Sequence, residues 1–171
     1  MKRTAKRLSM LAVLLAAASI VFLIESLIPP LFPLAPYVKI GLANVFVLFV
    51  IIVFGPADAF LFVLAKNLLT ALFAGWYAFP FNIAGSVCAY LAMAGTYCLF
   101  FPKISLVSVS VLGAIVSNIA RTAVAAAVLE APSLFVQVPF VAIFSTAAGI
   151  IVGVLTTFSV KYLPERLTKI K

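Results

Sequence analysis

Long apolar runs decide what this chain can fold into. The first of them, Ser9 to Ile28, is long enough as a helix to cross the ~30 Å hydrocarbon core of a bilayer, and further runs follow it. Basic residues precede it as in a signal peptide, but the later runs predict that it is a retained first helix. Hydrophobic residues make up 66% and charged residues 9% of the 171 residues. Soluble domains are roughly half apolar and a quarter charged, so the sequence predicts an integral membrane protein.

Breaks between the apolar runs predict six transmembrane helices within one domain, residues 1–171. Gly55 and Pro56 end the second run, which is short for a full span, and the proline suits the first turn of the next helix. Asp58 falls in that first turn, where a negative charge complements the helix macrodipole, so helix structure alone accounts for it. The predicted helices are residues 9–28, 40–54, 57–74, 81–101, 105–129 and 134–160.

The basic residues predict the orientation of the chain. Lysine and arginine are enriched on the cytoplasmic side of membrane proteins, and six helices put both termini on one side. That side carries most of the basic residues, namely Lys2, Arg3, Lys6, Arg7, Lys103, Lys161, Arg166, Lys169 and Lys171. Lys39 falls in a loop region on the opposite side. We therefore expect both termini in the cytoplasm, and we attribute the net charge of +8 to orientation rather than to nucleic-acid binding.

A proline-rich link joins the first two predicted helices, between Glu25 and Asn44. Proline fixes φ and pushes the preceding residue out of the helical region. Prolines at positions 29, 30, 33 and 36 therefore exclude a helix and predict an extended segment. The link brings Glu25, Lys39 and Asn44 together near the external membrane face. It is either a stiff hairpin between two spans or a lid over a binding site.

Charged and amide side chains at membrane depth are the candidates for a ligand site. A charge at the bilayer centre costs about 2.5–3.5 kcal/mol on the insertion scale, and such residues usually face a cavity or the bundle interior. Arg121 shares one helix face with Gly113 and Ser117, which leave room for it. The predicted ligand-binding residues are Glu25, Lys39, Asn44, Lys66, Asn67, Asn82, Asn118 and Arg121.

Two interpretations of these residues remain open. In one, Glu25 neutralises a cation and the asparagines join helices by hydrogen bonds. In the other, three cations near one carboxylate form a site for a carboxylate or a phosphate. Aromatic side chains from the loops would then cover the apolar part of the ligand. The excess of positive charge favours the second interpretation.

Two short motifs give the chain a family resemblance. Ser-Leu-Ile-Pro-Pro at 26–30 and Lys-Ile-Gly-Leu-Ala-Asn at 39–44 resemble the membrane-protein family called heptaprenyl diphosphate synthase component I, also known as Gx transporters. That family is grouped with the substrate-binding S subunits of energy-coupling-factor (ECF) transporters. The resemblance implies an S-component-like six-helix bundle in the bacterial inner membrane. It also implies that Ala12 and Ala16, small residues on one face of the first helix, dock on energising ECF-type subunits.

Together, the residues and the resemblance predict a binding or transport protein for a small anionic or amphipathic metabolite. The alternative is a non-catalytic membrane partner of a soluble prenyltransferase subunit, linked to heptaprenyl diphosphate and menaquinone synthesis. Prenyl transfer needs paired Asp-rich motifs that hold Mg²⁺, and Asp58 is the only aspartate of the chain. The sequence also lacks histidine and any nucleotide-binding motif. We therefore expect neither an enzyme nor a bound metal or cofactor.

Overall fold

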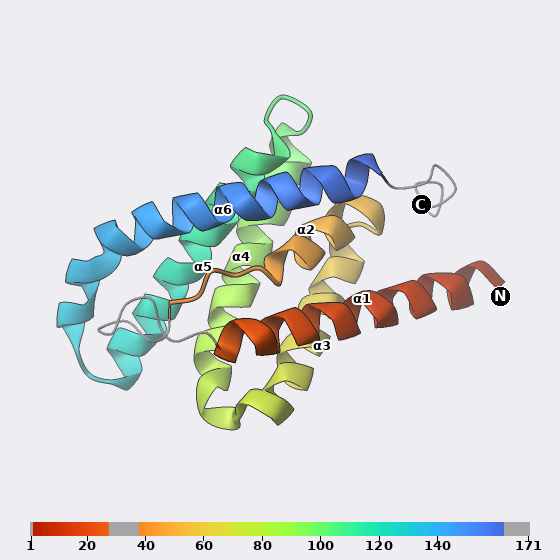
Figure 1. The fold of residues 1–171 in the computed structure, drawn as a ribbon. Helices are drawn as coiled ribbons and strands as arrows, with labels where there is room; N and C mark the ends of the chain where they lie inside the picture. Colours follow the sequence, from red (N-terminus) through yellow and green to blue (C-terminus); the bar gives the residue numbers. More distant parts are fainter. Residues whose placement is uncertain (1, 28–37, 163–171) are drawn as a thin grey trace.

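The computed structural model describes residues 2–27 and 38–162, and every regular element in them is helical, as predicted. Six α-helices and two 3-10 helices follow one another along the chain (Figure 1). The elements are α1 (Lys2–Leu27), α2 (Asn44–Val53), α3 (Pro56–Ala74), η1 (Trp76–Ala78), α4 (Phe79–Phe100), α5 (Leu106–Val128), η2 (Pro132–Gln137) and α6 (Val138–Lys161).

Five segments in the described ranges are long and apolar enough to cross a membrane. They are α1, α3, η1 with α4, α5, and η2 with α6, with mean hydropathies from 1.4 to 2.4. Their outward side chains are large and apolar, such as Leu27, Leu61 and Ile143, which are 84%, 66% and 72% exposed. Soluble monomers rarely expose large contiguous apolar patches, whereas lipid covers such side chains in a bilayer. The chain is therefore a multi-pass membrane protein, as the composition predicts.

Helix α2 is shorter than the sequence predicts. The expected helix over residues 40–54 begins only at Asn44, because Gly41 adopts a positive φ of 80° and accepts a hydrogen bond from the Asn44 N–H. At its other end, Gly55 has a φ of 101° and Pro56 begins α3. Ten residues of α-helix measure about 15 Å, half the thickness of the hydrocarbon core. Helix α2 alone is too short to span a bilayer, so the predicted count of six full spans is not confirmed.

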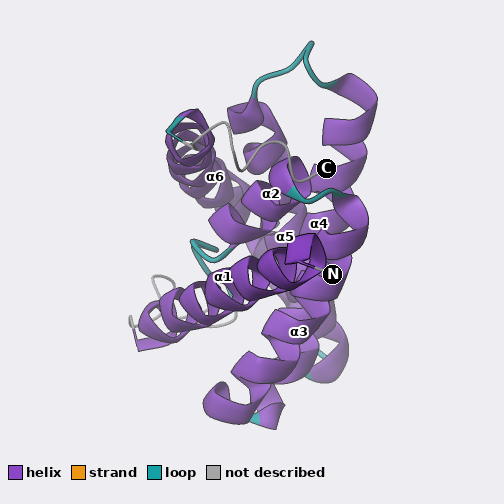
Figure 2. Cartoon of the chain, turned by 90° about the vertical axis from the view of Figure 1, so that its right-hand side faces the viewer, coloured by secondary structure: helices purple, strands orange, loops and turns teal. Residues whose placement is uncertain are grey.

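The six helices form two layers, with α2 enclosed between its neighbours. In Figures 1 and 2, α1, α2 and α6 lie in one layer, with α2 between the other two, and α3, α4 and α5 lie behind them. Helix α2 contacts α1, α3, α4 and α6. Its side chains Val47, Leu48, Val50 and Ile51 are almost fully buried. The apolar sequence of α2 thus forms the centre of the core rather than a lipid-facing helix.

Glycines bring α5 and α6 into close contact. A Cβ added to Gly149 would lie 2.6 Å from the Cα of Val111, and one added to Gly153 would lie 2.6 Å from the Cα of Val107. The Gly-x-x-x-Gly spacing on α6 therefore lets the two backbones approach, as small residues do in membrane bundles.

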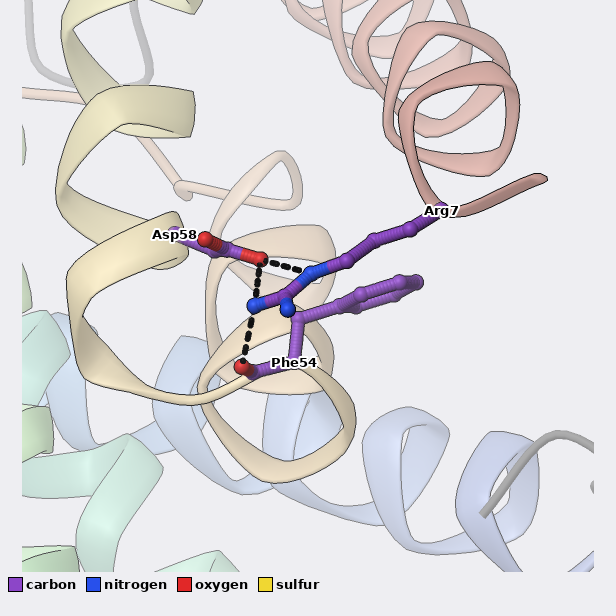
Figure 3. A network of polar contacts seen from close by, with 3 residues as sticks. All are labelled: Arg7, Phe54 and Asp58. Carbon is purple, nitrogen blue, oxygen red and sulfur yellow. Dashed lines mark hydrogen bonds and ion pairs between the residues drawn. The ribbon is translucent and has the colours of Figure 1, made fainter. Parts of the chain in front are cut away.

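Arg7 connects α1 to the turn between α2 and α3 (Figure 3). Its Nε donates to Asp58 Oδ2 at 2.7 Å and its Nη2 donates to the Phe54 carbonyl at 3.2 Å. The helix macrodipole therefore does not account for Asp58 alone, because its carboxylate also forms an ion pair with Arg7. This contact fixes the start of α1 beside the end of α2.

The two ends of the described chain lie on one side of the molecule. The first turns of α1 and the last turns of α6 extend in the same direction in Figure 1. The proline-rich link at 28–37 and the basic residues after 162 lie outside the described residues. The cytoplasmic location of the termini stays a prediction.

Candidate functional site

Arg121 is a buried arginine whose space is provided by a glycine of the neighbouring helix. It lies on α5, is 5% exposed, and donates from Nη1 to Asn82 Oδ1 at 2.7 Å. A Cβ added to Gly85 of α4 would lie 2.5 Å from Arg121 Nε and 2.8 Å from its Cγ. Nε is buried and has no hydrogen-bond partner in the described part of the chain. Since a guanidinium has five donors, Arg121 keeps donor capacity for a ligand.

The prediction that Gly113 leaves room for Arg121 on α5 is wrong. A Cβ at Gly113 would lie 2.5 Å from Met93 Cγ, so this glycine accommodates a core methionine of α4. The space for Arg121 comes from Gly85 on α4, across the helix interface.

Arg121 lies at a cavity of about 180 Å³ between charged and apolar walls. Two cations and one amide form the polar wall, and two aromatic rings with two aliphatic side chains form the apolar wall. The lining residues are Lys39, Asn82 and Arg121, and Tyr77, Ala78, Phe81 and Leu129. Such a cavity suits a molecule with an anionic group at one end and an apolar body.

The chain before α2 is held in place by side chains of α1 and α5. Asn118, midway along α5, accepts a hydrogen bond from the Lys39 N–H at 3.3 Å and donates one to the Lys39 carbonyl at 3.1 Å. Glu25 of α1 accepts a hydrogen bond from the Gly41 N–H. Lys39 therefore lies beside the middle of α5, inside the bundle, and not in an external loop as the sequence analysis expects. Non-helical backbone at such a position is tolerated where protein surrounds it.

The Lys39 side chain brings a second cation to the cavity. Its Nζ donates to Ser26 Oγ at 2.9 Å and lies 3.9 Å from the centre of the Phe22 ring, a cation–π contact. The positive charge of Arg121 repels this ammonium and the charge of Glu25 attracts it, but no carboxylate oxygen of the described residues lies within 4.0 Å of Nζ. The ammonium therefore lacks a carboxylate strong enough to offset its burial.

Lys66 is a third buried cation, 2% exposed, on α3. Its Nζ donates to Ser86 Oγ of α4 over a long 3.4 Å, and Ser86 in turn donates to Asn67 Oδ1 at 3.2 Å. The charges of Arg121, Glu25 and Lys39 all act on the Lys66 ammonium. Three cations thus share one buried region with one carboxylate.

Glu25 does not neutralise these cations by direct pairing. Within the described residues, the ion pair closer than 4.0 Å joins Arg7 to Asp58, at the other end of α1. Glu25 is buried at 6% exposure, and its carboxylate accepts a hydrogen bond from the Gly41 backbone N–H. Its observed role is to hold the segment that carries Lys39.

The predicted polar residues divide into three groups. Lys39, Asn82 and Arg121 line the cavity, whereas Glu25 and Asn118 hold the Lys39 segment from two sides. The remaining three lie outside the cavity lining: Asn44 begins α2, Asn67 donates to the Val63 carbonyl, and Lys66 donates to Ser86. The structure therefore brings most of the predicted residues into one region, although fewer of them face the open space.

Ala12 and Ala16 lie exposed on the outer face of α1, apart from the cavity. Ala12 also lines an apolar groove of about 250 Å³ between α1 and α3, together with Leu11, Leu15 and Phe62 among others. Their exposure is compatible with the predicted docking role, which stays a prediction.

The predicted site residues do not name the apolar lining of the cavity, for which the sequence predicts only aromatic side chains from the loops. Tyr77 and Phe81 belong to the aromatic region at η1, and Leu129 follows α5. Gly85 could have been found, because it follows Asn82 by three residues and so shares its helix face. Nothing local marks Ser86 as the acceptor for Lys66.

The profile of one family, described as heptaprenyl diphosphate synthase component I, matches residues 14–159. The chain belongs to the heptaprenyl diphosphate synthase component I family. The predicted resemblance is thus confirmed.

The family match covers the whole cavity region. Every residue that lines the cavity or holds the Lys39 segment falls within residues 14–159, whereas Arg7 and Ala12 precede the matched range. A search of the curated proteins found no match. The family description, which names a component I, implies a partner synthase component.

Proposed function

We propose that this chain is a non-catalytic membrane component that binds an anionic molecule with an apolar body in the Arg121 cavity. The family description, which speaks of component I of a synthase, supports a role beside a separate component that carries out prenyl transfer. The proposal makes the membrane protein the part that holds an amphipathic substrate or product.

One observation carries the binding role, namely that a buried arginine, Arg121, lines the cavity without an acidic partner within the described residues. A buried charge costs several kcal/mol unless partners compensate for it, and intramembrane charges commonly belong to functional sites. The hydrogen bond that Arg121 makes to Asn82 is to a neutral amide, and its Nε has no partner in the described part of the chain. A bound anion would supply the missing acceptors through two-point contacts with the guanidinium.

The acidic residues argue against catalysis by this chain. Magnesium on a diphosphate requires several oxygen ligands, and the sequence has one aspartate and three glutamates. Asp58 forms an ion pair with Arg7 and Glu25 binds the Gly41 backbone. Chemistry on a prenyl diphosphate would therefore have to come from the partner component.

A second candidate function is that of a carrier resembling the ECF S subunits. The interruption before α2 favours it, because transporters build their sites from broken helices whose backbone lines the cavity. The exposed positions of Ala12 and Ala16 on α1 also favour it. Replacing both alanines with tryptophan should then abolish capture of energising subunits without changing ligand affinity.

Binding can be tested with octyl phosphate and octanoate, two soluble anions with the same number of carbon atoms. Arg121→Gln should weaken binding of the tighter probe about ten- to a hundredfold, the cost of about 1.5–3 kcal/mol for a lost charged hydrogen bond. Arg7→Gln is the matched control, because it removes an arginine that binds Asp58 away from the cavity. Unchanged affinity in Arg121→Gln would refute the binding role.

The two functions differ in what the purified protein does with partners. Co-purification with a soluble prenyltransferase component, and stimulation of that component by the membrane protein, would support the synthase role. Uptake of the probe into proteoliposomes that contain ECF-type energising subunits would instead support the carrier.

A further inference from the structure

We propose that the groove between α1 and α3 binds a phospholipid whose zwitterionic head group ends in a primary ammonium. The Arg7–Asp58 ion pair binds the head group, and the groove holds part of an acyl chain. This groove is separate from the Arg121 cavity, so the proposal does not depend on the function proposed for that cavity.

Two small side chains leave the groove open between two membrane-spanning segments. Ala12 of α1 and Ala65 of α3 are both exposed, and longer apolar side chains flank them. The groove has a volume of about 250 Å³ and follows each helix for about 10 Å, a third of the hydrocarbon core. Its lining residues are Leu8, Leu11, Ala12 and Leu15 of α1, and Asp58, Leu61, Phe62 and Ala65 of α3. All of them except Asp58 are apolar, as the environment of an acyl chain requires.

The polar end of the groove lies where both segments enter the membrane. The apolar span on α1 begins at Ala5 and the one on α3 begins at Pro56. Arg7 and Asp58 follow these positions directly, so their ion pair lies at the depth of the lipid head groups. A lipid with its head group at this pair would therefore extend its acyl chain along the groove toward the bilayer centre.

The ion pair leaves one donor group and one acceptor for a ligand. Arg7 donates from Nε to Asp58 Oδ2 at 2.7 Å and from Nη2 to the Phe54 carbonyl at 3.2 Å. Within the described residues, neither Arg7 Nη1 nor Asp58 Oδ1 makes a hydrogen bond, and Oδ1 points away from Arg7 in Figure 3. The two side chains are 39% and 20% exposed, so a head group can reach both.

A zwitterionic head group matches this pair in charge. Its ammonium donates to Asp58 Oδ1, and its phosphate accepts from Arg7 Nη1, both of them charge-assisted hydrogen bonds. An anionic glycerol head group can bind Arg7, but the carboxylate of Asp58 repels it. A choline head group has no N–H group that could donate to Asp58. The pair therefore selects for the primary ammonium.

The shape of the groove favours an acyl chain over a partner helix. Helices that approach closely in membranes pack over runs of small residues. Here Ala12 lies among Leu8, Leu11 and Leu15, to which a flexible chain adapts more easily than a rigid helix. Ala16 does not line the groove, so the groove does not coincide with the predicted two-alanine docking face.

The head group is tested with three dioctanoyl phospholipids, whose binding to the delipidated full-length protein in detergent is measured by native mass spectrometry. Phosphatidylethanolamine should bind roughly two- to tenfold more tightly than phosphatidylcholine or phosphatidylglycerol, the range expected for one hydrogen bond. Asp58→Ala should abolish this preference, because it removes the acceptor for the ammonium. Arg121→Gln, in the separate cavity, should leave the preference unchanged.

The groove itself is tested by filling it. Ala12→Leu should weaken binding of phosphatidylethanolamine by at least about tenfold, because leucine occupies volume that the acyl chain needs. Ala16→Leu is the matched control, since Ala16 is exposed one turn further along α1 and outside the groove. Thermal melting of the delipidated variants checks that they fold. If Ala12→Leu does not fold, Ala65→Leu fills the groove from α3 and replaces it.

The other outcomes would each overturn the proposal. Equal affinities for the three lipids, or tighter binding of phosphatidylglycerol, would contradict the selection for an ammonium. Wild-type affinity in Ala12→Leu would remove the lipid from the groove. If this variant also lost capture of ECF-type energising subunits, the groove would belong to a partner helix. Loss of octyl phosphate binding at the Arg121 cavity would refute only the proposed function.

Discussion

Replacing Gly85 with alanine should disable the anion site although no residue that lines the cavity is substituted. The new Cβ would lie 2.5 Å from Arg121 Nε, 2.8 Å from Cγ and 3.1 Å from Cζ. These atoms lie in the middle of a buried side chain, so the guanidinium must move as a whole. This movement would break the hydrogen bond between Arg121 and Asn82 and would shift the guanidinium away from the cavity wall.

The expected magnitudes follow from this displacement. Loss of a charged hydrogen bond costs about 1.5–3 kcal/mol, which predicts roughly ten- to a hundredfold weaker binding of octyl phosphate. Overpacking costs about 1–3 kcal/mol of stability, while alanine gains about 0.8–1.0 kcal/mol over glycine in a helix. These two effects together lower the free energy of unfolding by up to about 2 kcal/mol, and the broken hydrogen bond to Asn82 adds to that loss. Isothermal titration and thermal melting in the same detergent measure the two effects separately.

Two other glycines serve as controls. Gly113→Ala places a Cβ 2.5 Å from Met93 Cγ in the same α4–α5 interface, and methionine can adapt its conformation. It should have a similar overpacking cost, without the loss of a hydrogen bond, and should leave affinity unchanged. A Cβ added at Gly95 would meet nothing within 4 Å, so Gly95→Ala should gain only the helix-propensity difference between alanine and glycine. Wild-type affinity in Gly85→Ala, or equal losses in Gly85→Ala and Gly113→Ala, would refute the assignment of Arg121 to the site.

Three further outcomes are expected. Asn118→Ala should lower the free energy of unfolding by about 1–3 kcal/mol and speed hydrogen exchange at the Lys39 amide. Unchanged exchange would contradict the role of Asn118 in holding the Lys39 segment. Asp58→Asn should lower the free energy of unfolding by at most about 1 kcal/mol, because its partner Arg7 is 39% exposed. Any loss of octyl phosphate affinity in this variant would contradict the separation of Asp58 from the site. A reporter at the C-terminus should be cytoplasmic, and an external reporter would overturn the predicted orientation.

The helical class and the membrane location could be predicted because they depend on local composition. Apolar runs long enough for a bilayer dictate helices wherever the chain lacks proline and glycine. The Gly55-Pro56 break also acts locally, and the structure ends α2 and begins α3 there. Even the main candidates for the site follow from the same logic, because Arg121 and Lys66 are costly in lipid and so had to lie inside the bundle.

Tertiary structure decided which of these side chains meet. Residues 40–43 are mostly apolar and resemble a helix, but the positive φ of Gly41, whose N–H binds Glu25, delays α2 until Asn44. Gly113 is on the same helix as Arg121, yet Gly85, 36 residues earlier in the chain, provides its space. Periodicity in the sequence specifies the faces of one helix. Which faces meet depends on how the helices pack, and that packing places Asn82 beside Arg121 and turns Lys39 into the bundle.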